Sequence, residues 1–148
     1  MKKNQYDEKQ QFDRGRAFQY SAICFLLWLI VWECICEITG LFAEPLTELL
    51  VLMAPPFAVC LIACVVKDAY DPIGSRPGMV LFALMPAMSL FVLVMMIVRG
   101  EPVIADNTVT TEGGLAAIHA AWITTSAVYW IKYIRDTRAE NAGLSEEE

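Results

Sequence analysis

Four long apolar blocks, separated by short polar segments, dominate the pattern of the chain. The blocks span residues 22–38, 49–66, 79–98 and 115–134. An α-helix rises about 1.5 Å per residue, so about 20 apolar residues cross a hydrocarbon layer of roughly 30 Å. The pattern therefore predicts an all-α protein, a four-helix transmembrane bundle in which residues 1–148 form a single integral membrane domain.

The composition excludes several classes of protein. Of the 148 residues, 57% are hydrophobic, whereas soluble globular domains hold about 45–50% apolar residues. The sequence contains no Gly-rich phosphate loop and no basic stripe with interleaved aromatic residues, which argues against nucleotide and nucleic-acid binding. The first block follows a polar segment and lacks a small-x-small cleavage site, so we expect it to remain in the mature protein.

Basic residues are distributed very unevenly between the two predicted ends of the helices. Arg99 is the one basic residue in the connections at one end. The other ten precede the first block, lie in the connection 67–78, or lie near the end of the fourth block and after it: Lys2, Lys3, Lys9, Arg14, Arg16, Lys67, Arg76, Lys132, Arg135 and Arg138. Because short loops rich in Lys and Arg stay in the cytoplasm, we expect a multi-pass protein of the cell (plasma) membrane with both termini cytoplasmic.

The formal net charge of −6 belongs to the opposite, outer end. Seven acidic residues accompany Arg99 there: Glu33, Glu37, Glu44, Glu48, Glu101, Asp106 and Glu112. The remaining ten acidic residues balance the ten cations of the cytoplasmic end. One interpretation is that the outer loops merely lack Lys and Arg; the alternative is a surface that attracts cations or a basic peptide.

The polar segment 1–21 mixes charged and aromatic residues. Its spacing predicts a juxtamembrane amphipathic helix that lies at the cytoplasmic interface, with Gly15 as a hinge before the first span. At the other terminus, the polar tail 137–148 ends in three glutamates. We expect this tail to fray beyond the fourth helix.

The same N-terminal segment carries a resemblance. Its Tyr-Asp-Glu-Lys-Gln run and the following Arg-Gly-x-Ala-Phe motif comprise Tyr6, Asp7, Glu8, Lys9, Gln10, Arg14, Gly15, Ala17 and Phe18, with Tyr20 close behind. This run resembles the start of uncharacterised small four-span membrane proteins of Gram-positive bacteria, over about the first 20 residues. The resemblance implies a small bacterial membrane protein and no catalytic residues. The candidates for docking a partner are Tyr6, Asp7, Glu8, Arg14 and Phe18.

Glu33 and His119 are a candidate intramembrane polar pair. Each lies a short way inside the outer end of its predicted span, at about 7–8 Å below the same interface. A carboxylate beside an imidazole responds to protons, and ionisable groups inside a membrane are functional hypotheses by default. The alternatives are a structural hydrogen bond between the two, or two separate side chains that look into water.

Pro55 and Pro56 lie in the middle of the second block and are a candidate helix break. Proline lacks a backbone donor and clashes with the preceding turn. In lipid the freed carbonyl groups need neighbouring helices, hydroxyl groups or water. The two prolines are interpreted either as a packing kink or as part of a substrate or ion path.

Cys34 and Cys36 are candidate thiols at the outer end of the first span. Four spans with such a pair resemble the quinone-linked disulfide-generating membrane enzymes, although those use a Cys-x-x-Cys unit and a second outer pair that this sequence lacks. Alternate residues of a helix point about 200° apart, so a disulfide here requires an unwound helix. The alternative is a set of buried, inert thiols.

The leading functional hypothesis is a non-enzymatic accessory, regulatory or interaction protein of the membrane. Its expected partners are the lipid bilayer and either another protein or further copies of the chain, with no nucleic acid. No cofactor and no metal are expected, because Cys60 and Cys64 supply only two of the four ligands of a structural zinc site. The alternative is a small transporter or channel-like protein with a path near Pro55, Pro56, Glu33 and His119. A membrane thiol-redox protein is the third hypothesis.

Overall fold

The computed structural model describes residues 8–69 and 76–144. Within these ranges the main elements are four helices: α1 (Glu8–Thr39), α2 (Pro45–Val66), α3 (Arg76–Arg99) and α4 (Thr111–Leu144). Each contains a stretch long and apolar enough to cross a membrane. The predicted all-α, four-helix fold is confirmed, and the chain is an integral membrane protein.

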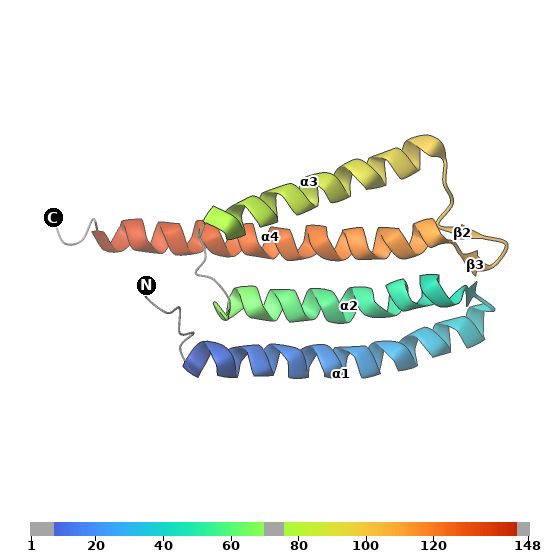
Figure 1. Ribbon diagram of the computed structural model, residues 1–148, viewed down its shortest axis with the longest axis horizontal. Helices are drawn as coiled ribbons and strands as arrows, with labels where there is room; N and C mark the ends of the chain where they lie inside the picture. The colour runs from blue at the N-terminus through green and yellow to red at the C-terminus, as the bar shows by residue number, and fades with distance from the viewer. Residues whose placement is uncertain (1–7, 70–75, 145–148) are drawn as a thin grey trace.

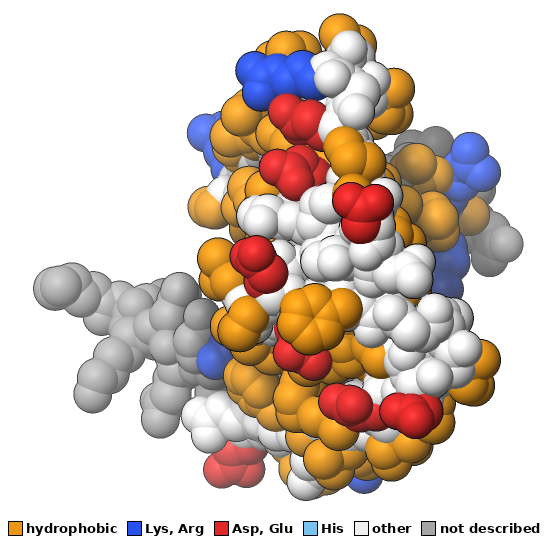
Figure 2. Space-filling view, turned by 90° about the vertical axis from the view of Figure 1, so that its right-hand side faces the viewer, with side chains coloured by type: hydrophobic (Ala, Val, Ile, Leu, Met, Phe, Trp, Pro, Cys, Tyr) orange, Lys and Arg blue, Asp and Glu red, His pale blue; other side chains and the backbone are white. Residues whose placement is uncertain are grey.

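The helices lie in a row in the order α1, α2, α4, α3 (Figure 1). The principal helix contacts join α1 to α2, α2 to α4, and α4 to α3. Figure 2, which looks along the helices, shows an outline that is taller than it is wide. α1 and α3 are therefore the edges of the row, and their exposed apolar side chains include Leu26, Ile30, Leu84 and Phe91. In a bilayer, lipid or another protein chain covers these faces.

α1 runs without interruption from Glu8 through Gly15 to Thr39. Its first turns pack against the end of α2, where Ala17 is fully buried with Cys64 and Ala69. The described part of the N-terminal segment thus continues the first span along the same axis. The prediction of a separate interfacial helix hinged at Gly15 is wrong, because a helix in the membrane plane loses this packing against α2.

α2 continues through Pro55 and Pro56 as one helix. Pro55 has no N–H for the carbonyl of Val51, four residues earlier. The indole Nε1 of Trp28 donates to that carbonyl instead, at 3.1 Å, and the hydroxyl of Ser21 donates to the Pro56 carbonyl at 2.8 Å. The predicted helix break is wrong, because side chains of α1 supply donors at the two prolines.

α4 is the longest helix of the described chain. Its 34 residues correspond to about 51 Å at the usual helical rise, which exceeds the thickness of the hydrocarbon layer. The last turns of α4 extend beyond the other helices at the end where α1 begins (Figure 1). The expectation of a frayed tail from residue 137 is wrong as far as Leu144, and residues 145–148 lie outside the described ranges.

A three-stranded sheet joins the two connections at the opposite end of the row. Strand β3 (Thr108–Val109) lies between β1 (Phe42–Ala43), which runs parallel to it, and β2 (Ile104–Ala105), which runs antiparallel. Asp106 and Asn107 both have positive φ in the turn between β2 and β3, as a type I′ hairpin turn requires. We call this end the strand end, and the end where α1 begins and α4 finishes the terminal end.

Two glycines allow α4 to approach its neighbours closely beside the sheet. A β-carbon added to Gly114 would lie 3.2 Å from the side chain of Leu50 in α2, and one added to Gly113 would lie 2.5 Å from the Val103 carbonyl oxygen. Small residues permit such contacts between membrane helices. The Gly113–Gly114 pair is thus explained by the crossing of α2 and α4.

Candidate functional site

At the terminal end, a nearly buried lysine of α4 caps the C-terminus of α2. The ammonium of Lys132 lies 2.6 Å from Asp68 Oδ2 and donates a hydrogen bond of 3.1 Å to the Val65 carbonyl. Lys132 is 7% exposed, and Asp136 lies one turn further along α4, 3.9 Å from Nζ. The last carbonyls of a helix carry partial negative charge, so both the carboxylate and the helix dipole favour the ammonium here.

The residues that follow α2 form a turn that holds the first turns of α1. Asp68 has a φ of 52°, and the N–H of Ala69 donates to the Cys64 carbonyl at 2.9 Å, as in a Schellman motif. Arg14 of α1 donates from Nε to the Ala69 carbonyl at 2.8 Å. The turn therefore serves as an acceptor for a cation of α1 as well as for Lys132.

A second ion pair reinforces the same junction. Lys67 Nζ lies 3.5 Å from Asp13 Oδ1, with 27% and 13% of the two side chains exposed. Together these groups tie α1, α2 and α4 to one another. We call them the terminal clamp: Asp13, Arg14, Lys67, Asp68 and Lys132.

The sequence carries one signal for the terminal clamp. Lys132 lies inside the fourth apolar block, and a cation at such a position requires a partner. The pattern does not identify that partner, because Asp68 is 64 residues away along the chain. The terminal clamp was consequently absent from the sequence-based candidates.

The predicted pair of Glu33 and His119 is not formed, although both residues belong to the described chain. The Nδ1 atom of His119 lies 3.1 Å from the hydroxyl of Ser89, which is 2% exposed. Glu33 is exposed on α1, at the edge of the row. α2 separates α1 from α4, so a residue of α1 does not reach the imidazole. His119 instead forms a polar contact between α4 and α3.

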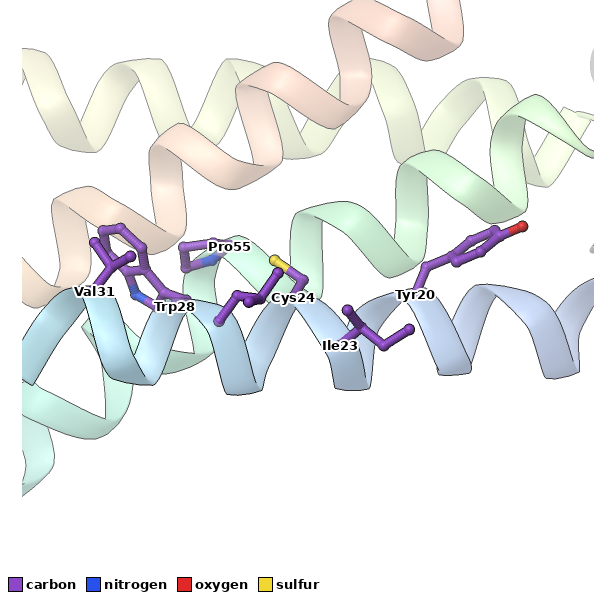
Figure 3. Close-up of a pocket in the computed structure, with 7 residues that line it drawn as sticks. Tyr20, Ile23, Cys24, Trp28, Val31 and Pro55 are labelled. Atoms are coloured by element: carbon purple, nitrogen blue, oxygen red, sulfur yellow. The ribbon is translucent and has the colours of Figure 1, made fainter.

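Pro55 borders an apolar groove between α1 and α2. Figure 3 shows this groove, in which Trp28 and Cys24 of α1 lie beside Pro55. Its volume is about 370 Å³, and its lining residues are uncharged: Tyr20, Ile23, Cys24, Leu27, Trp28, Val31 and Pro55. Glu33 is not among them. An apolar lining offers no stabilisation to an ion or a polar substrate at this level of the membrane.

The five cysteines of the chain, all within the described ranges, are free thiols. Cys34 is exposed on an unbroken helix, and Cys36 packs against a cluster that contains Trp32 and Val51. The helix is not unwound between the two, so the geometry for a disulfide is missing. Over residues 8–69 and 76–144, no three His, Cys, Asp or Glu side chains form a group able to hold a metal ion.

The docking candidates near the N-terminus have different environments. Glu8 and Phe18 are exposed, and Phe18 retains 58% of its accessible surface. Arg14 is part of the terminal clamp. Tyr6 and Asp7 lie outside the described residues. Glu8 and Phe18 thus remain accessible to a partner, whereas Arg14 already contacts the chain itself.

A cleft opens between α3 and α4 at the strand end. Its volume is about 490 Å³, and it combines an apolar wall with three charged residues: Phe91, Val92, Met95, Met96, Arg99, Glu101, Glu112 and Leu115. Arg99 Nη1 lies 3.6 Å from Glu101 Oε1. The sequence indicated the acidic character of this end but gave no indication of the cleft.

Acidic side chains are spread over the whole strand end. Figure 2 looks onto this end and shows them from one edge of the row to the other. The seven acidic residues predicted for this end occupy the last two turns of α1, the start of α2, the connection 100–110 and the first turn of α4. The structure thus places the excess negative charge at one end of the row.

Comparison with known proteins gives no relative: no family model matches the chain, and no curated protein and no solved structure matches it significantly.

Proposed function

We propose that this integral membrane protein is a non-enzymatic accessory or regulatory protein that acts by contacting another protein at its terminal end. The observation that carries the proposal is the extension of α4 beyond the other helices (Figure 1). From Ile134 to Ala142 every residue is exposed except Thr137, which is half-buried. The extension is therefore a helical surface that the described chain leaves uncovered.

The chemistry of this extension suits a partner on the water side of the membrane. Its exposed charged residues have both signs: Arg135, Asp136, Arg138 and Glu140. Helices shorter than about 12–15 residues are marginally stable in water without packing. Contact with a partner would supply the packing that these last turns lack.

The distribution of Lys and Arg supports a cytoplasmic position for the terminal end in the cell membrane. Ten of the 11 basic residues belong to the segments of this end. A cytoplasmic partner is therefore the partner that the proposal names. A reporter enzyme that is active only in the cytoplasm, fused after Glu148, is expected to be active.

The features on which a transport path was predicted support the contact role instead. Pro55 and Pro56 lie within a continuous helix, and side chains of α1 donate to backbone carbonyls beside them. His119 is paired with Ser89 rather than with Glu33. These polar groups thus act in packing between helices.

A truncation after Thr137 tests the proposal. It removes exposed residues and retains the whole terminal clamp, so helicity and thermal stability are expected to stay unchanged. The full chain, purified from its native cells with a tag at the N-terminus, should recover a discrete partner that the truncated chain does not recover. Recovery of the same partner by both chains, at equal yield, would contradict the proposal.

A further inference from the structure

We propose that the cleft between α3 and α4 at the strand end binds a zwitterionic membrane phospholipid, with its phosphate on Arg99 and its primary ammonium on Glu101 and Glu112. The occupant is a lipid of the surrounding bilayer. This inference goes beyond the proposed protein contact, because the two surfaces lie at opposite ends of the row.

The shape of the cleft follows from the way in which α3 is fastened to α4. Near the terminal end, the indole of Trp130 donates to the Phe82 carbonyl at 3.0 Å, and the rings of Phe82 and Tyr129 stack at 4.3 Å. Further along, His119 contacts Ser89. Beyond this point α3 leans away from α4 toward the strand end (Figure 1). The cleft occupies the space that this divergence opens.

The walls of the cleft suit an acyl chain. Phe91, Val92 and Met95 of α3 face Leu115 of α4 across it. Binding sites for small molecules usually measure about 300–1,000 Å³ and are mostly apolar, and the cleft has about 490 Å³. Methionine side chains adapt to an irregular apolar surface. Within a bilayer, the most abundant group that fits such a wall is a lipid hydrocarbon chain.

The charged residues of the cleft lie at the level of the headgroups. Arg99 directly follows the apolar block of α3, where basic residues meet the membrane interface. Its side chain is 65% exposed, although its guanidinium lies 3.6 Å from Glu101. A guanidinium has five N–H donors in a planar fork that matches a phosphate. Arg99 therefore retains donors for a phosphate beside its contact with Glu101.

The two carboxylates select among headgroups. Glu101 and Glu112 against Arg99 leave the rim of the cleft with one excess negative charge. A headgroup with a net negative charge is disfavoured there, whereas an ammonium compensates the carboxylates. A primary ammonium also donates three hydrogen bonds, which a quaternary ammonium cannot do. Phosphatidylethanolamine therefore fits better than phosphatidylcholine or phosphatidylglycerol.

Native mass spectrometry of the full chain in detergent tests this selectivity. The probes are phosphatidylethanolamine, phosphatidylcholine and phosphatidylglycerol with identical acyl chains, added in equal amounts. We expect the native chain to retain phosphatidylethanolamine about tenfold better than phosphatidylglycerol, a difference of about 1.4 kcal/mol. Equal retention of the two lipids by the native chain would overturn the proposal.

Variants of the charged residues separate the two halves of the headgroup. Arg99→Gln should reduce retention of all three phospholipids by about tenfold, since it removes a charge-assisted contact to phosphate. The double variant Glu101→Gln, Glu112→Gln should lose the preference for phosphatidylethanolamine and retain more phosphatidylglycerol. Unchanged selectivity in this double variant would overturn the assignment of the ammonium.

The matched control is the double variant Glu37→Gln, Glu44→Gln. It changes the net charge of the strand end by the same amount, at two exposed positions outside the cleft. Its lipid preference should equal that of the native chain, and circular dichroism should show equal helicity in all variants. A loss of preference in this control would show that only the overall charge matters, which overturns the proposal.

The apolar wall has its own test. Val92→Trp fills the cleft and should lower the retention of all three lipids. The soluble headgroup glycerophosphoethanolamine, which has no acyl chains, should not displace bound lipid. Efficient displacement by it, or a protein dimer that Val92→Trp abolishes, would overturn the proposal, because either result assigns the wall to something other than an acyl chain.

Discussion

The two ends of the helical row treat charge in opposite ways. At the terminal end, Lys132 is 7% exposed and contacts both Asp68 and a backbone carbonyl of α2. At the strand end, Arg99 is accompanied by seven acidic residues, and 65% of its side chain is exposed. The difference shows that charge holds helices together at one end and stays accessible to ligands at the other.

Lys132→Met should cause the largest loss of stability. Methionine keeps most of the length of the side chain but removes the ammonium, which leaves the Val65 carbonyl without this donor. We expect the free energy of unfolding to fall by about 2 kcal/mol, in the range for lost hydrogen bonds to charged groups. Denaturant titration in detergent measures it. Arg138→Met, on the exposed extension, is the control, and an equal loss there would remove the contrast between the two ends.

Trp28→Phe should have the next largest effect. The variant removes the donor to the Val51 carbonyl that Pro55 leaves unserved, at an expected cost of about 1–2 kcal/mol. Trp122→Phe is a matched control, because the described contact of that indole is a ring contact with Phe57. In a Pro55→Ala background the backbone N–H at position 55 can serve the carbonyl, so the cost of Trp28→Phe should shrink. An unchanged cost in that background would contradict this explanation.

Arg99→Gln should change stability by less than about 0.5 kcal/mol, because exposed ion pairs contribute little and are screened by salt. The same titration measures it. A loss as large as that of Lys132→Met would mean that the strand end is held together by charge in the same way as the terminal end.

The smallest expected effect is the coupling between Glu33→Gln and His119→Ala. Residues that share no contact usually give additive losses within about 0.3–0.5 kcal/mol. His119→Ala with Ser89→Ala should instead show a measurable coupling, because their atoms lie 3.1 Å apart. A double-mutant cycle on both pairs decides the matter, and a larger coupling for Glu33 than for Ser89 would contradict the arrangement of the helices.

Hydropathy was sufficient to predict the helices but not their order in the row. The blocks 22–38 and 115–134 lie within α1 and α4, which are much longer because polar residues extend both helices beyond the hydrocarbon layer. Which helices meet depends on contacts that are distant in sequence, such as Gly114 against Leu50. A pattern along one chain contains no term for these contacts.

The candidate residues show the same limit. The sequence correctly indicated that carbonyls near Pro55 need donors, yet it could not indicate Trp28 as the donor. Glu33 and His119 share a depth in the membrane, but depth does not fix lateral position, and α2 lies between their helices. The turn at Asp106 and Asn107 is a local signal that the sequence does contain, because Asx residues readily adopt positive φ.

Photo-crosslinking at the end of α4 tests the central claim most directly. A photoreactive amino acid in place of Glu140 lies on the exposed extension, and one in place of Ile97 lies on the exposed apolar face of α3, where 78% of the side chain is accessible. In intact cells we predict a discrete protein adduct from position 140 and no protein adduct from position 97. Discrete adducts from position 97 alone, or from neither position, would contradict a protein that acts through contacts at its terminal end.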